Sequence, residues 1–297
     1  MRRCPRRRLG AALLALTQLV APSTAQPADY LGTVIWADPA PAFGGFSAIE
    51  VDADGAGFWA LSDRATLWRG QIVRDAGGQM LAAEAVAHWP LHNIEGAPLR
   101  GHETDAEGLA MAPDGGLFIS FEGLTRVVLY ARPDAPSAPL PRPEAFRSMQ
   151  GNSALEALAI GPDGALYTLP ERSGRLDAPF PVWRFRDGIW DQPFVVPRDA
   201  TWLPVGADFG PDGRLYLLER DYWGLVGFLS RVRRFELTEA GLTGGEVLIE
   251  TRVRTHDNLE GISVWRDAAG ALRVTMIADN NFRAFQRNEI VEYRIGD

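Results

Sequence analysis

The chain has 297 residues, 46% of them hydrophobic, and a formal net charge of −8. This length is enough for a large hydrophobic core, and the acidic balance argues against nucleic acid and anionic lipid as general partners. All 30 basic residues are arginine, which excludes Schiff-base chemistry and a phosphate-binding loop that needs lysine. Bidentate recognition of phosphate or carboxylate by arginine stays open.

Residues 1–25 have the pattern of a secretory signal peptide. Five arginines precede an apolar run from Leu9 to Val20, and Ser23 and Ala25 fit a cleavage site before Gln26. The run is shorter than the roughly 20 residues of a membrane span, so no membrane anchor is expected after processing. The arginine pairs leave export by the twin-arginine route open beside the general secretory route.

We therefore expect a signal peptide over 1–25, one domain over 26–297, and a periplasmic or secreted protein. Without the signal peptide the net charge becomes −13, because five arginines and no acids are removed. Cys4 is the only cysteine and lies in the signal peptide, so the mature chain would contain neither a disulfide nor a reactive thiol.

A motif with a period near fifty residues runs through the rest of the sequence. Its copies are "FSAIEVDADGAGFWALSDR" from Phe46, "EGLAMAPDGGLFISFEG" from Glu107, "EALAIGPDGALYTLPER" from Glu156, "VGADFGPDGRLYLLER" from Val205, and a degenerate copy from Glu260. Each copy reads as two strands joined by a tight Asp-Gly or Asp-x-x-Gly turn, because glycine supplies the positive φ that such turns need. Further strand-like runs follow each copy.

Four strands in about fifty residues make one blade of a β-propeller. The sequence therefore predicts an all-β fold, a propeller of four-stranded blades with very little helix. Five copies predict five blades, and a sixth blade in degenerate sequence remains an alternative. Pairing of the late strand at 289–295 with the spare strand at 29–36 would close the ring and remove exposed sheet edges. The proline-rich run 131–147 is expected to be an exposed loop.

Charged residues recur at two positions of the motif. Glu107, Glu156 and Glu260 begin the first strand of their copies, where the other two copies have Ser47 and Val205. The second strands end in Asp63-Arg64, Glu122, Glu171-Arg172, Glu219-Arg220 and Asp279-Asn280-Asn281. Antiparallel pairing would bring both sets to one mouth of the central channel. Such a group could bind a divalent cation through oxygen and an anion through arginine, or could tie neighbouring blades together.

These motifs resemble the bacterial phytase-like family, described as having the "esterase-like activity of phytase". The resemblance rests on "DAEGLAMAPDGGLFISFEG", "NSALEALAIGPDGALYTLPER", "GPDGRLYLLERDYW" and "NLEGISVWRD" with "IADNNF", and it extends over about residues 29–297. It implies an exported propeller that hydrolyses phosphate or carboxylic esters, by analogy with calcium-dependent propeller phytases.

That analogy implies a role for each candidate residue. The ligands or catalytic base would be Glu107, Glu156, Glu260 and Asp279, with Glu107, Glu260 and Asp279 holding Ca²⁺. The substrate anion would be bound by Arg64, Arg172, Arg220, Arg283, Asn280 and Asn281.

Two other functions stay open at this point. A single-metal lactonase resembling the gluconolactonase propellers would need fewer carboxylates and no arginine at the mouth. A periplasmic binding or scaffold propeller would use the polar ring only to join its blades. In the two enzymatic readings the partner is a small anionic ester or a lactone.

Overall fold

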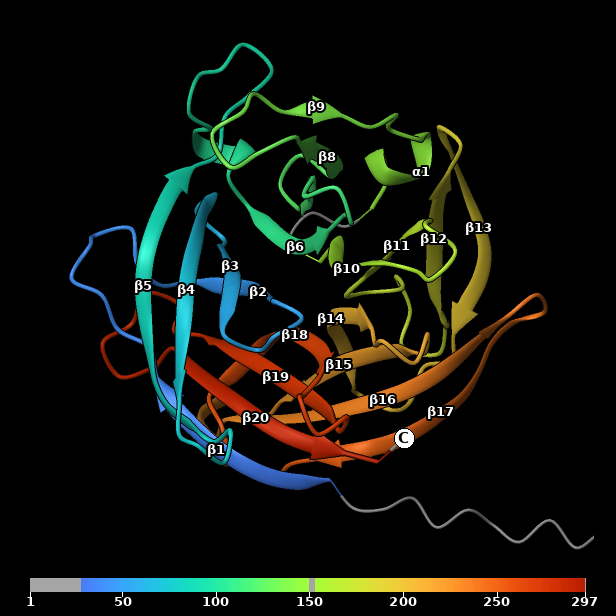
Figure 1. Cartoon of the computed structure of the whole chain (residues 1–297). Helices are drawn as coiled ribbons and strands as arrows, with labels where there is room; N and C mark the ends of the chain where they lie inside the picture. Colours follow the sequence, from blue (N-terminus) through green and yellow to red (C-terminus); the bar gives the residue numbers. More distant parts are fainter. Residues whose placement is uncertain (1–27, 150–152, 297) are drawn as a thin grey trace, which may run out of the picture.

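The computed structural model describes residues 28–149 and 153–296, which form five four-stranded antiparallel sheets around a central axis (Figure 1). The expected signal peptide, 1–25, lies outside the described residues. Five blades are present, as the five copies predict, and the six-blade alternative is wrong. Within the described ranges no helix is both long and apolar enough to cross a membrane.

Each blade runs from the axis outward in chain order, except that the fifth blade ends with the first strand of the chain. Blade 1 has β2 (Phe46–Val51), β3 (Gly57–Ser62), β4 (Thr66–Arg74) and β5 (Met80–Pro90). Blade 2 has β6 (Ala106–Met111), β7 (Leu117–Phe121), β8 (Arg126–Tyr130) and β9 (Ala138–Pro139). Blade 3 has β10 (Leu155–Ile160), β11 (Leu166–Pro170), β12 (Phe180–Arg186) and β13 (Ile189–Val196).

Blade 4 has β14 (Leu203–Phe209), β15 (Leu215–Tyr222), β16 (Phe228–Thr238) and β17 (Gly241–Glu250). Blade 5 has β18 (Asn258–Arg266), β19 (Leu272–Asp279), β20 (Glu289–Ile295) and β1 (Asp29–Ile35). The described helices are short: α1 (Glu144–Arg147) and the 3-10 turns Gly101–Glu103 and Gly224–Val226. The predicted ring closure is confirmed, since β1 pairs with β20 from Asp29 opposite Arg294 to Ile35 opposite Glu289.

The aspartate of each repeat shapes the turn between the first two strands of its blade. In the third blade, for example, Asp163 Oδ1 accepts a hydrogen bond from the backbone N–H of Ala165, and Gly164 between them has φ +75°. This side-chain turn needs a short acceptor followed by a residue that tolerates positive φ, which explains the Asp-Gly signal. The turns at Asp54, Asp114 and Asp212 are built in the same way. The turn at Asp267 is longer, because its Oδ1 accepts hydrogen bonds from the N–H groups of Ala269 and Ala271 and the positive φ falls at Gly270.

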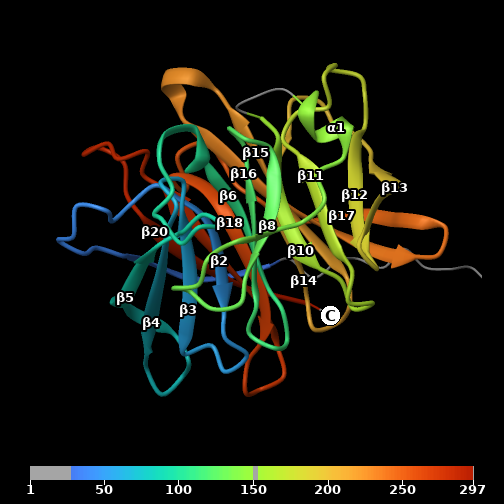
Figure 2. The ribbon, with the colours of Figure 1, turned by 90° about the horizontal axis from the view of Figure 1, so that it is seen from above.

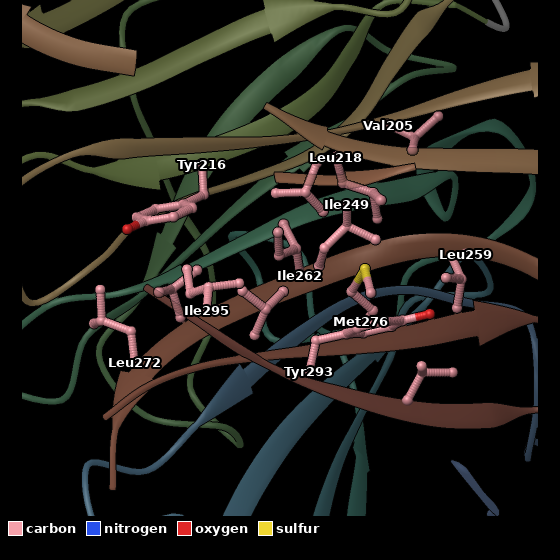
Figure 3. Packing of buried hydrophobic residues seen from close by; sticks show 14 of the residues in the cluster. Val205, Tyr216, Leu218, Ile249, Leu259, Ile262, Leu272, Met276, Tyr293 and Ile295 are labelled. Carbon is pink, nitrogen blue, oxygen red and sulfur yellow. The ribbon is translucent and has the colours of Figure 1, made fainter. Parts of the chain in front are cut away.

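Neighbouring blades are held together by layers of apolar side chains. Between blades 4 and 5, Val205, Leu218 and Ile249 pack against Leu259, Met276 and Ile295 (Figure 3). Burial of these faces on both sides of each sheet supplies the main stabilisation in a chain that is expected to have no disulfide.

The expectation that 131–147 is an exposed loop is only partly right. The segment contains β9, the two-residue edge strand of blade 2, and the helix α1, whose Phe146 is buried against Trp183 and Trp190. Prolines are tolerated there because an edge strand needs few backbone N–H donors.

Candidate functional site

Every inner strand carries a β-bulge close to its beginning. In β10, Leu155 pairs with Pro170 and Ala157 with Leu169, so Glu156 is the extra residue. The same shift occurs in the other four blades, at Ser47, at Glu107-Gly108, at Val205 and at Glu260. A bulge redirects a side chain out of the regular ladder. The five equivalent residues thus form a ring around the channel, here called the inner ring: Ser47, Glu107, Glu156, Val205 and Glu260.

Directly after the inner ring the channel narrows to a constriction, here called the waist, where the free volume is only about 10 Å³. A Cβ atom added to Gly206 would lie 2.4 Å from the carbonyl oxygen of Glu260, and one added to Gly261 would lie 2.7 Å from the Cα of Ala48. Glycine at these positions therefore lets adjacent inner strands approach each other closely. The waist separates one mouth of the channel from the other.

A second ring, here called the outer ring, lies where the second strands end. On each second strand, the member of this ring comes directly after the residue that pairs with the one preceding the bulge. The five members are Asp63, Glu122, Glu171, Arg220 and Asp279. In the inner ring, blade 1 has Ser47 and blade 4 has Val205 in place of an acid, and in the outer ring blade 4 has Arg220 in place of a carboxylate. The prediction that both sets face one mouth agrees with the electrostatic coupling of Glu107 to Glu122 and Glu260.

The adjacent charges Glu219 and Arg220 serve different purposes because successive strand residues point to opposite faces. Glu219 is fully buried inside blade 4 and accepts hydrogen bonds from Arg231 and Arg233 at 2.6–2.7 Å. Arg220 points toward the neighbouring blades. Its Nη2 donates to Glu171 at 2.8 Å, and its Nη1 donates to Asn258 at 2.9 Å and forms an ion pair with Glu260.

On the opposite side of the same mouth, carboxylates gather without an arginine between them. Carboxylate oxygens of Asp105, Glu107 and Glu122 lie within 4.8 Å of one another, and we call these three residues the acidic cluster. Glu122 also accepts a hydrogen bond from the N–H of Ala154 at 2.9 Å and is hydrogen-bonded to Glu156. Such a set of hard oxygen donors is what Ca²⁺ or Mg²⁺ binds.

Burial and mutual repulsion raise the pKa values of these acids. Burial raises the pKa of Glu107 well above its usual value, and the nearby charges of Glu122 and Glu260 raise it further. Burial, with Glu107 and Glu122 adding to it, has the same effect on the pKa of Glu156. Burial raises the pKa of Asp63 to about 6 and that of Asp279 to about 8. Carboxyl groups tuned to this range suit proton transfer near neutral pH.

Beside the rings, a pocket of about 700 Å³ opens between blades 3, 4 and 5, and we call it the arginine pocket. Five arginines line it: Arg172, Arg220, Arg254, Arg283 and Arg287. Its acids are Glu171, Asp257 and Glu260, which leaves two positive charges in excess. Burial lowers the pKa of His256, another lining residue, to about 4, so its ring is neutral. An acidic protein thus concentrates positive charge beside its channel mouth.

The residues predicted to bind substrate lie in two different places. Arg172, Arg220, Arg283 and Asn281 line the arginine pocket. Arg64 lies elsewhere, with its guanidinium carbon 3.3 Å from the centre of the Phe282 ring. Asn280 has a structural role in its loop, since its Oδ1 accepts hydrogen bonds from the N–H groups of Gly45 and Phe282. Neither Arg64 nor Asn280 is among the residues that line the pocket.

Sequence reasoning missed part of this site. Asp105 precedes the first strand of its blade, outside the two repeated positions, although the acidic run "HETDAEG" could have suggested it. Arg254 lies in the β17–β18 connection and Arg287 in the β19–β20 loop, outside the repeated motif, so no repeat pointed to them. Asp63 was among the strand-end residues but was not singled out as a catalytic candidate. Its Oδ1 is buried and accepts no hydrogen bond from the described residues.

The opposite mouth of the channel has a different character. A cavity of about 450 Å³ there is lined by apolar residues and by two partly buried acids, Glu50 and Asp208. Asp208 Oδ2 accepts a hydrogen bond from the N–H of Val264 at 2.6 Å, and burial raises its pKa to about 7. None of the arginines in the described ranges lines this cavity, so the two mouths differ in charge as well as in size.

Comparison with solved structures shows the same fold at very low sequence identity. An α-L-arabinofuranosidase from Podospora anserina aligns with a TM-score of 0.53 and 10% identity, covering 92% of this chain and 98% of that one. The calcium-binding protein regucalcin from Agrobacterium tumefaciens aligns with a TM-score of 0.50 and 14% identity, covering 90% and 94%. At such identities only the fold is shown.

An aldose sugar dehydrogenase from Streptomyces coelicolor also aligns, with a TM-score of 0.50 and 13% identity over 92% of this chain and all of that one. Among curated proteins no significant match was found. A family model, in contrast, matches residues 41–282, a range that includes both rings and most of the arginine pocket. The chain therefore belongs to the phytase-like family, described as having the esterase-like activity of phytase.

Proposed function

We propose that this protein is an exported, metal-dependent hydrolase of small anionic esters, acting at the mouth that carries the two rings. One observation carries the proposal: the acidic cluster, which has no arginine partner in the described part of the chain, lies beside a pocket with an excess of positive charge. Glu260 connects the two, since it lines the pocket and its charge raises the pKa of Glu107. The family's description, esterase-like, supports the same reaction class.

The donor set fits a hard divalent cation. Oxygen atoms bound to one Ca²⁺ lie about 2.3–2.6 Å from the ion, so any two of them lie within about 5 Å of each other. The 4.8 Å span of the acidic cluster meets this condition. Glu107, Glu122 and Asp105 would hold the cation. Of the three Ca²⁺ ligands that the family resemblance implies, Glu107 belongs to this set, whereas Glu260 and Asp279 do not. When bound, such an ion lowers the pKa of water and offsets negative charge on a reacting oxygen.

Side chains of the protein would bind the substrate anion and transfer the protons. Arg283 faces the pocket and has no carboxylate partner among the described residues, so its guanidinium is free to hold a substrate anion. The half-buried carboxylate of Asp63, with a pKa of about 6, can take a proton from an attacking water at neutral pH. Asp279, with a pKa of about 8, is protonated at that pH and can return a proton to the leaving group.

The five pocket arginines favour an anionic ester over a neutral lactone, because lactone hydrolysis needs no guanidinium group. Arg220 forms ion pairs that connect three blades, which favours a structural role for this residue, as expected for a scaffold propeller. Glu122 does join blade 2 to blade 3 through its hydrogen bonds with Ala154 and Glu156. The same explanation does not extend to Glu107, whose buried carboxylate forms no ion pair among the described residues and lies close to other carboxylates that repel it.

A thermal-shift experiment tests the proposal. The protein is treated with chelator, and its melting temperature is measured with and without Ca²⁺, Mg²⁺ or Zn²⁺. A ligand at 100 times its Kd stabilises the folded state by about 2.7 kcal/mol, so a rise of several degrees is expected for one cation. The rise should be lost in Glu107→Gln and kept in Glu95→Gln, an exposed acid outside both rings.

Turnover of phosphate and carboxylic esters is then screened with the stabilising cation and compared with turnover of lactones. Loss of ester turnover in Arg283→Gln is the expected result. A protein that no cation stabilises and that turns over no ester would leave only the non-catalytic function. Lactone turnover that is insensitive to Arg283→Gln would select the lactonase.

Export is part of the proposal and rests on the pattern of residues 1–25. N-terminal sequencing of the protein recovered from outside the cytoplasm should begin at Gln26. A chain that keeps Met1 and its five arginines in the cytoplasm would contradict export.

A further inference from the structure

The arginine pocket has an apolar edge as well as a charged floor. Its lining includes Leu203, Tyr222, Leu225, Phe228 and Phe285 beside the arginines. Leu225 is 99% exposed and Phe285 78% exposed. Trp223 and Val226 are exposed in the same loop as Leu225, so large apolar side chains are concentrated on this side of the mouth. Figure 2 shows the β15–β16 loop projecting from one face of the ring.

The β15–β16 loop is held in place by the residues around it. Arg254 donates hydrogen bonds to the carbonyl oxygens of Val226 at 2.7 Å and Leu225 at 3.3 Å. Arg254 has φ +64°, a conformation that costs a non-glycine residue energy and that its neighbours must impose. Tyr222 stacks on Phe228 with ring centres 4.9 Å apart. The exposed leucine at the tip is therefore presented by a fixed loop.

Exposure of this kind has a cost, because a protein gains by covering large apolar groups. A covering ligand must also suit the guanidinium groups next to them. Arg283 lies close to Phe285, with its guanidinium carbon 5.9 Å from the ring centre, and neither Arg254 nor Arg283 has a carboxylate partner in the described part of the chain. Charge and apolar surface thus meet within one cavity.

We infer that the arginine pocket takes an ester whose anionic group carries an apolar acyl, alkyl or aryl substituent, a substrate class that rests on the hydrolase function proposed above. The anion lies at Arg283, and the substituent lies over Leu225 and Phe285. A polyanion without an apolar part would leave this edge uncovered. An anionic membrane surface fits less well, because the chain as a whole carries an excess of negative charge and the apolar groups line a cavity.

Binding is measured by calorimetry with the full chain in chelator, so that no turnover is needed. The probes are methyl phosphate and hexyl phosphate, which share the anion and differ in apolar area. Hexyl phosphate should bind at least about tenfold more tightly than methyl phosphate. Burial of two methylene groups is enough to give this ratio of Kd values. The double variant Leu225→Ser/Phe285→Ser should bring the ratio close to one. Leu176→Ser/Ile189→Ser, which alters exposed apolar residues outside the pocket, should leave it unchanged.

Arg283→Gln should weaken both probes by the same factor, because it removes only the contact with the anion. Equal affinities in the unaltered protein, a ratio that survives Leu225→Ser/Phe285→Ser, or no binding of either probe would each overturn the inference. Binding to phosphatidylglycerol vesicles that depends on Leu225 and Phe285, without discrimination between the probes, would overturn it in favour of a membrane surface.

The same experiment separates this inference from the proposed function. Selective binding of hexyl phosphate without hydrolysis under any cation would contradict the hydrolase and keep the amphiphilic site. Hydrolysis of methyl and hexyl phosphate with equal KM would keep the hydrolase and contradict the amphiphilic site.

Discussion

The guanidinium of Arg220 in blade 4 forms an ion pair with the carboxylate of Glu260 in blade 5, and its second Nη atom binds Glu171 of blade 3 at 2.8 Å. One side chain thus joins three blades where the outer ring has its only cation. The acidic cluster lies on the other side of the same mouth, and none of the residues that the structure describes gives it such a counter-charge. This contrast separates the structural part of the site from the part we assign to catalysis.

Arg220→Ala should strongly destabilise the protein. It would leave Glu171 and Glu260 buried without their cation, and breaking a buried pair in this way costs about 3–5 kcal/mol. Chemical denaturation followed by tryptophan fluorescence measures the change. The matched control is Arg172→Ala, whose half-exposed side chain lies 3.4 Å from Glu171 and whose loss should cost less than about 1 kcal/mol. Equal losses of unfolding free energy in the two variants would contradict the structural role assigned to Arg220.

Glu107→Gln should stabilise the cation-free protein while removing its response to cations. Burial and neighbouring acids raise the pKa of Glu107, so the ionised carboxylate costs free energy in the folded state. A neutral amide of the same shape should raise the free energy of unfolding by about 1 kcal/mol or more at pH 8. Denaturation in chelator, with Glu95→Gln as the control, measures this. A less stable Glu107→Gln variant would show that the carboxylate joins blades.

Asp208→Asn should change how stability depends on pH. Folding raises the pKa of Asp208 from its ordinary value near 4 to about 7, so the folded state binds more protons than the unfolded state between these pH values. The contribution of this group is therefore fully present at low pH and is lost as the pH rises through about 7. Relative to the unaltered protein, Asp208→Asn should gain about 4 kcal/mol in unfolding free energy between pH 4 and pH 8.

Glu50 is the acid that faces Asp208 at this second mouth, and burial followed by the charge of Asp208 raises its pKa. Denaturation series at several pH values in chelator test the prediction. A constant difference between Asp208→Asn and the unaltered protein across that range would refute it.

Gly206→Ala should destabilise the protein far more than Gly164→Ala. The cause is a steric clash and not the backbone conformation. Gly206 does not have positive φ, but its added Cβ would lie 2.4 Å from the carbonyl oxygen of Glu260 in the next blade. Overpacking of this kind costs about 1–3 kcal/mol or more, because two inner strands must separate.

Gly164 has φ +75° with nothing within 4 Å of an added Cβ, so its substitution carries only the conformational cost of about 1–2 kcal/mol. Melting temperatures of the two variants make the comparison. A milder effect at Gly206 than at Gly164 would mean that the inner strands can move apart at little cost.

The sequence by itself determined the architecture, because the signals for it are local and repeated. An Asp-Gly turn between two strands needs only its own few residues, so five copies predict five blades, and the strands at 29–36 and 289–295 pair as their positions at the two ends suggest. The same repeat also located Glu107, Glu156 and Glu260, since equivalent residues of a ring must converge on its axis.

Only the tertiary structure decided which charges meet. The sequence does not show that a bulge in each inner strand turns Glu156 and its counterparts into the channel, because a bulge depends on pairing with another strand. It also could not separate Glu219 from Arg220, which point to opposite faces, or bring Arg254 and Arg287 to one pocket from loops without repeats. Distances between residues of different blades come from the packing of the whole ring, and these distances distinguish an ion pair that joins blades from a cluster that can bind a cation.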